Sequence, residues 1–174
     1  MNQKGLLMNI IPYEKYSFRC NLTVKEATVK LKDNIEQGKL FRFRFGGGTK
    51  IFQGEFYNND FKISRIISYH NSFLPQIKGK IRSEGNTIII DVKMLLHPFV
   101  IIFMCIWFSG VILGCAVSVL PFINNIIQGS TIPPGFFIPF VMLIFGIGLC
   151  TIPFSIEAKI AKNELAKIFN VYTE

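Results

Sequence analysis

The fold of this chain is decided by residues 94–156, which read MLLHPFVIIFMCIWFSGVILGCAVSVLPFINNIIQGSTIPPGFFIPFVMLIFGIGLCTIPFSI and contain no Asp, Glu, Lys or Arg. The whole chain has 174 residues and 17% of them are charged, whereas a soluble domain carries about a quarter. The missing charge is concentrated in this one apolar block. This composition excludes an ordinary soluble globular protein and a disordered chain, and it indicates a membrane protein.

Two segments of the block have the length of a membrane span. A bilayer core of about 30 Å is crossed by about 20 helical residues, and residues 99–120 and 136–156 meet this requirement. The linker between them, 122–134, is short and polar. We therefore predict a transmembrane helical hairpin over residues 98–156.

Positive charges are distributed unevenly around the predicted hairpin. Residues 1–97 contain 16 Lys and Arg, residues 157–174 contain three, and the linker contains none. Positively charged flanks remain on the cytoplasmic side of a membrane. We therefore expect a multi-pass protein with both termini in the cytoplasm.

Small residues recur every four positions in the first span, at Gly110, Gly114 and Ser118. This pattern lets two helix backbones approach closely. Two interpretations stay open. The stripe packs against Gly146 and Gly148 of the second span, which we favour, or it joins several chains into a homo-oligomer.

Residues 1–97 have the pattern of an α+β domain. Alternating segments predict six short strands, at 16–22, 40–45, 51–57, 61–67, 76–82 and 87–94. Strands spaced this closely are mainly antiparallel, because parallel pairs need long crossovers. The expected architecture is an antiparallel sheet or open barrel with one packed helix.

The packed helix begins at a capping box formed by Thr23 and Glu26. Apolar residues follow at helical spacing, at Val24, Ala27, Leu31 and Ile35, and Gly38 is the expected stop.

A second amphipathic helix is predicted after the hairpin, in residues 157–174. Its stripe consists of Ile156, Ile160, Ala161, Leu165, Ile168 and Phe169. This helix lies on the lipid surface, or it returns to cover the sheet. We favour the second alternative, because a single helix covers a sheet of five or six strands poorly.

Basic residues on two predicted strands are candidates for binding an anion. Arg42 and Arg44 share one strand face, as do Lys78, Lys80 and Arg82. The expected ligand is an anionic small molecule, a nucleotide or a phospholipid. The competing explanations are a solvated face, attraction to anionic headgroups of membrane lipids, and protection of a sheet edge against pairing.

The loop at 64–73 holds the densest group of polar and aromatic side chains. Arg65, Tyr69, His70 and Asn71 are candidate ligand-binding residues, because functional residues favour loops on rigid scaffolds. Alternatively, these side chains only bond the loop backbone and the headgroup layer.

The chain has none of the sequence patterns GxSxG, HExxH or Walker A. His70 and His97 are its only histidines, and neither has Cys or carboxylate neighbours at metal-ligand spacing. We therefore predict no catalytic residue, no metal and no cofactor, and hence no enzyme. No motif for duplex nucleic acid accompanies the positive charge.

The run from Phe61 to Pro75, together with Ile77 to Ile81 and the Leu96-His-Pro98 entry into a span, resembles a family of uncharacterised bacterial two-span membrane proteins. That resemblance implies a bacterial inner membrane and no established activity. The element order is also similar to a reduced helix-grip fold. The overall plan is similar to small β-barrel, two-span effectors of antiphage nucleotide signalling.

These features predict a membrane protein with a cytoplasm-facing, non-enzymatic ligand-binding or sensing domain. The alternatives are a membrane-disrupting effector opened by ligand binding or oligomerisation, and a structural membrane accessory.

Overall fold

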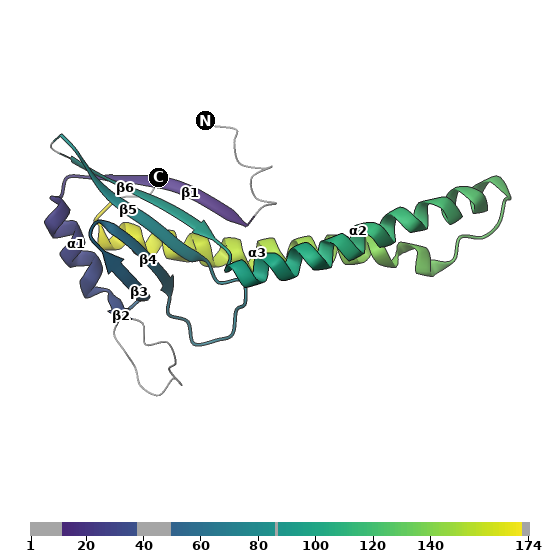
Figure 1. Cartoon of the computed structure of the whole chain (residues 1–174), viewed down its shortest axis with the longest axis horizontal. Coiled ribbons are helices and arrows are strands. Elements are labelled where there is room, and N and C mark those ends of the chain that lie inside the picture. The colour runs from purple at the N-terminus through teal and green to yellow at the C-terminus, as the bar shows by residue number, and fades with distance from the viewer. Residues whose placement is uncertain (1–11, 38–49, 86, 172–174) are drawn as a thin grey trace.

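The computed structural model describes residues 12–37, 50–85 and 87–171. Within them, the six strands are β1 (Tyr13–Cys20), β2 (Ile35–Gln37), β3 (Phe52–Tyr57), β4 (Asp60–Arg65), β5 (Gln76–Glu84) and β6 (Thr87–Leu95). They form one open sheet in the order β1-β6-β5-β4-β3-β2 (Figure 1). All neighbours are antiparallel except β2 and β3, which are parallel. The α+β prediction is confirmed, as an open sheet rather than a barrel. The strand predicted at 40–45 lies outside the described residues.

The first helix, α1 (Val24–Asp33), begins at the predicted capping box. The Glu26 backbone N–H donates to the Thr23 hydroxyl at 3.2 Å, and the Thr23 backbone N–H donates to the Glu26 carboxylate at 2.8 Å. The helix ends earlier than predicted, because the Asn34 side-chain amide donates to the Lys30 carbonyl and caps the last turn. Ile35 therefore belongs to the short strand β2 and not to the helix.

The apolar block forms two long antiparallel helices, α2 (Pro98–Ile127) and α3 (Ile138–Ile168), joined through the short 3₁₀ helix η1 (Pro134–Phe137). The linker predicted at 122–134 is wrong in its first part, since α2 continues through Pro121 to Ile127. In an apolar surrounding, a continued helix keeps the backbone N–H groups bonded, and this outweighs the one bond that Pro121 lacks.

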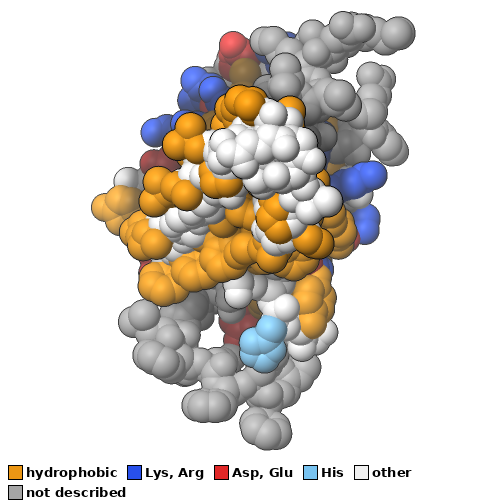
Figure 2. All heavy atoms as spheres, turned by 90° about the vertical axis from the view of Figure 1, so that its right-hand side faces the viewer, with side chains coloured by type: hydrophobic (Ala, Val, Ile, Leu, Met, Phe, Trp, Pro, Cys, Tyr) orange, Lys and Arg blue, Asp and Glu red, His pale blue; other side chains and the backbone are white. Residues whose placement is uncertain are grey.

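Both helices of the hairpin have the length and composition to cross a membrane, and only 11% of the most apolar window of each is buried. They project away from the sheet as an extended pair (Figure 1). Figure 2, viewed from the tip of the hairpin, shows hydrophobic side chains over its surface, with Lys and Arg only around it. These helices are therefore not the buried core of a soluble domain.

The last four turns of α3 leave the hairpin and pack on one face of the sheet. Phe154, Ala158 and Leu165 of α3, and Phe169 at its C-cap, join the same core as residues of α1 and the strands. This confirms the preference for a C-terminal helix that covers the sheet. The buried stripe is rotated relative to the predicted one. Ile156, which was predicted to belong to it, is 55% exposed.

Two glycines let the strands carry large side chains on the packed face. A Cβ at Gly79 of β5 would lie 2.1 Å from the ring of Phe61, which is buried over it. Gly54 of β3 has φ +149°, and a Cβ there would lie 2.2 Å from the Lys62 carbonyl oxygen. The opposite face of the sheet carries exposed, mostly charged side chains, and we call it the open face.

Candidate functional site

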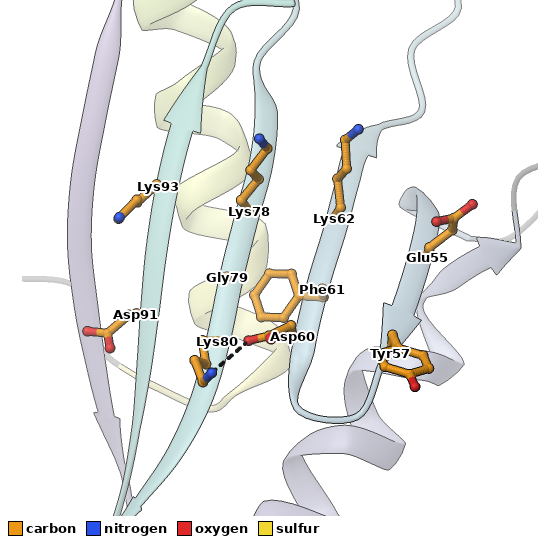
Figure 3. A pocket seen from close by; sticks show the side chains of 10 residues that line it. All are labelled: Glu55, Tyr57, Asp60, Phe61, Lys62, Lys78, Gly79, Lys80, Asp91 and Lys93. Carbon is orange, nitrogen blue, oxygen red and sulfur yellow. Dashed lines mark ion pairs between the residues drawn. The ribbon is translucent and has the colours of Figure 1, made fainter.

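Four lysines lie directly opposite one another across the open face. Lys15 of β1 pairs with Lys93 of β6, Lys93 with Lys78 of β5, and Lys78 with Lys62 of β4. All four side chains are exposed. Figure 3 shows Lys93, Lys78 and Lys62 on adjacent strands. We call these four residues the lysine row.

The charges in the next row of the open face are neutralised within the sheet. Lys80 Nζ lies 3.6 Å from the Asp60 carboxylate, and Arg82 forms an ion pair with Asp91. The Ser17 hydroxyl donates to Asp91 at 2.7 Å. This hydrogen bond and the Arg82 guanidinium hold the pKa of Asp91 below its ordinary value.

The lysine row itself is not neutralised in this way. Within residues 12–37, 50–85 and 87–171, no carboxylate lies at ion-pair distance from any of its four ammonium groups. Glu55 of β3 lies opposite Lys62 at the end of the row without forming an ion pair in the described structure. Three lysines of the row help to line a hollow of about 440 Å³, together with Glu55, Tyr57, Asp60, Phe61, Gly79, Lys80 and Asp91.

The row lies at the end of the sheet nearest the hairpin. Lys93 precedes Pro98, the first residue of α2, by five positions, which is at most about 17 Å of extended chain. In Figure 1, β6 runs toward the hairpin and leads into α2. An anion bound at the row is therefore close to the start of the apolar helices.

Two of the candidate residues in the loop at 64–73, Arg65 and Tyr69, contact Glu157, which was not predicted as a site residue. Arg65 Nη2 lies 2.6 Å and Nε 2.9 Å from the Glu157 carboxylate, and Arg65 Nη2 lies 3.0 Å from the Tyr69 hydroxyl. The Tyr69 hydroxyl also donates to Glu157. Glu157 is 2% exposed and lies on α3. This junction ties the end of β4 to α3 and leaves little of its charge free for a ligand.

The other two predicted loop residues have different surroundings. His70 is exposed, and the Asn71 side-chain oxygen accepts a hydrogen bond at 2.9 Å from the Phe73 backbone N–H. Asn71 thus holds the turn of its own loop. Arg42 and Arg44 lie outside the described residues.

Gly110, Gly114 and Ser118 of α2 do not share one common partner surface. A Cβ added at Gly114 would lie 3.6 Å from Pro139 of α3. A Cβ added at Gly110 would have no atom within 4 Å among the described residues, apart from its own stretch of helix. The Ser118 hydroxyl donates to the Gly114 carbonyl. Gly146 of α3 faces Trp107 and Phe108 instead. Self-association through Gly110 stays a prediction.

Lys15, Lys62 and Lys93 were also missed as binding residues, although the sequence carried part of the signal. The hairpin at Gly85 sets Lys78 opposite Lys93, whereas the pairing of Lys78 with Lys62 crosses a ten-residue connection between β4 and β5.

No group of three or more potential metal ligands occurs among the described residues. Comparison with known protein families, curated proteins and solved structures gave no match. The resemblance to a bacterial two-span family stays a prediction.

Proposed function

We propose that this chain is an integral membrane protein whose sheet domain binds a phosphate-bearing anion on its open face, as a sensing module without catalytic activity. The observation that carries the proposal is the lysine row. Four exposed ammonium groups lie on adjacent strands in direct register, while the neighbouring basic residues Lys80 and Arg82 have acidic partners.

Repulsion within the lysine row is expected to lower the stability of the unliganded sheet. Side chains directly opposite on neighbouring strands have Cβ atoms about 5 Å apart, and like charges at this position are destabilising. An anion with several oxygens, placed over the row, meets two or more ammonium groups at once and removes this repulsion. Lysine binds phosphate groups as a compact point charge.

The membrane assignment is supported by the two long, exposed apolar helices. The 16 Lys and Arg of residues 1–97 favour a cytoplasmic location for the sheet domain. The row is also connected to the hairpin through the chain itself. Lys93 lies on the strand that leads into α2, and Lys62 lies three residues before Arg65, which holds Glu157 of α3. A bound anion thus acts on strands that are attached to both apolar helices.

The test is titration calorimetry of the detergent-solubilised full chain with inorganic pyrophosphate at low ionic strength. We expect binding that weakens as salt is added, because salt screens exposed charges. The triple variant Lys62→Gln/Lys78→Gln/Lys93→Gln should bind at least about tenfold more weakly, since each basic residue near a phosphate contributes about 1 kcal/mol.

The matched control removes three positive charges that already have partners on the same face, in Arg19→Gln/Lys80→Gln/Arg82→Gln. This variant should retain most of the binding. If both triple variants lose binding equally, net charge and not the lysine row is responsible. If the unmodified chain does not bind pyrophosphate, the proposal is wrong.

A further inference from the structure

An apolar groove opens where the hairpin meets the sheet. It has a volume of about 340 Å³ and is lined by Pro12 and Leu96 at the sheet end, by Ile101 and Cys105 of α2, and by Ile147 and Cys150 of α3, among others. Along α2 the lining extends from Ile101 to Phe108, about 10 Å of helix. The groove therefore runs from the end of the sheet into the apolar part of the hairpin.

The two strands that end at this groove also carry half of the lysine row. Pro12 directly precedes β1 and Leu96 directly follows β6, and Lys15 and Lys93 lie three residues farther along the same two strands. Three residues of extended chain span about 10 Å. Tyr13 and Leu95 form the pair next to the groove on the open face. Tyrosine is a residue type that favours the headgroup level of a membrane.

β1 is the edge strand of the described sheet, and within the described residues no further strand pairs with it between the groove and the open face. The order from the groove to the open face is an apolar groove, an aromatic residue and then a pair of lysines. A glycerophospholipid has the same order, with an acyl chain, an interfacial glycerol region and a phosphate headgroup. A soluble nucleotide has no part that fits the groove.

We propose that the ligand is one anionic phospholipid of the surrounding membrane, with an acyl chain in the groove between α2 and α3 and its phosphate at Lys15 and Lys93. This inference rests on the proposed function and names the ligand class of the same site. The groove holds the lipid whatever its headgroup, and the two lysines select for negative charge. Since one basic residue favours an anionic headgroup about fivefold, two favour it about 30-fold.

The experiment is native mass spectrometry of the full chain after reconstitution in bilayers of phosphatidylglycerol and phosphatidylcholine in equal amounts. We expect one lipid to be retained per chain, with phosphatidylglycerol preferred about 30-fold. Lys15→Gln/Lys93→Gln should retain a lipid but lose the preference. Cys105→Trp fills the groove and should retain none, whereas the control Ile106→Trp, on the adjacent exposed position, should behave as the unmodified chain.

Equal retention of the two lipids by the unmodified chain would overturn the inference, and so would full retention of phosphatidylglycerol by Cys105→Trp. The proposed function fails separately. If pyrophosphate still binds through the lysine row while no lipid is retained, the row is an anion site for a soluble ligand and only the lipid assignment is wrong.

Discussion

Basic side chains have different partners on the two faces of the sheet. On the packed side, Arg65 meets Glu157 and Tyr69 at hydrogen-bond distance, and Glu157 is almost fully buried. On the open face, the four lysines of the row meet each other in direct register and have no carboxylate at ion-pair distance in the described part of the chain.

This difference distinguishes Arg65, whose charge is paired within the fold, from the lysine row, whose charges are not paired in the described residues. Removing one partner of a buried ion pair leaves an uncompensated charge, so the Arg65 junction stabilises the packing of α3 on the sheet. The like charges of the lysine row lie directly opposite one another, which is destabilising, and they form no ion pair in the described residues. The two regions should therefore respond oppositely to mutation.

The largest expected effect is at the junction. Glu157→Ala leaves the Arg65 guanidinium without its carboxylate, and we expect the sheet domain to lose about 3 kcal/mol of unfolding free energy, the lower end for a broken buried pair because 18% of the Arg65 side chain stays exposed. Urea unfolding in detergent, followed by circular dichroism and by hydrogen exchange of β4 and α3, measures this loss.

A control on the same helix is Glu164→Ala. Glu164 pairs with Lys167 at 2.8 Å, but the Lys167 side chain is 71% exposed, so the expected change is below about 0.5 kcal/mol. Similar losses for Glu157→Ala and Glu164→Ala would mean that the junction is no more than a surface ion pair.

A smaller effect is expected between β4 and β5, where Gly79 leaves room for the Phe61 ring. Gly79→Ala forces a Cβ against that ring and should cost about 1–3 kcal/mol, the usual range for overpacking. In a double-mutant cycle, Phe61→Leu should recover part of this loss, because the smaller side chain withdraws from the added methyl group. Strictly additive losses would show that the two residues do not touch in solution.

Much of the packed side follows from the sequence. The capping box at Thr23, the apolar positions Ala27 and Leu31, and the apolar block before Glu157 are local patterns, and each produced the expected element. Two boundaries failed for local reasons. Asn34 caps α1 with its own side chain, and Pro121 lies within α2 without ending it.

The site depends on long-range pairing that no local pattern contains. The turn at Gly85 sets Lys78 opposite Lys93, but Lys15 joins the row only because β1 pairs with β6, more than 70 residues away in the chain. The Arg65 contact with Glu157 spans 92 residues and requires α3 to return to the sheet. Glu157 did carry one signal, as the first charged residue after the apolar block.

The smallest effect has the opposite sign and tests the row directly. Lys78 lies opposite both Lys62 and Lys93, so Lys78→Gln removes two like-charge contacts and should stabilise the unliganded chain by a few tenths of a kcal/mol. The gain should shrink as salt is raised, because the Debye length falls from about 30 Å at 0.01 M to about 3 Å at 1 M. Urea unfolding at these two salt concentrations measures it.

Lys80→Gln, two residues along the same strand, is the matched comparison, since Lys80 has Asp60 as a partner and its loss brings no gain. A loss of stability in Lys78→Gln that is independent of salt would mean that the methylene groups of Lys78 pack on the sheet and that the row is part of the fold. A salt-dependent gain would instead show that the fold tolerates the row at a cost, which is the condition expected of residues kept for an external anion.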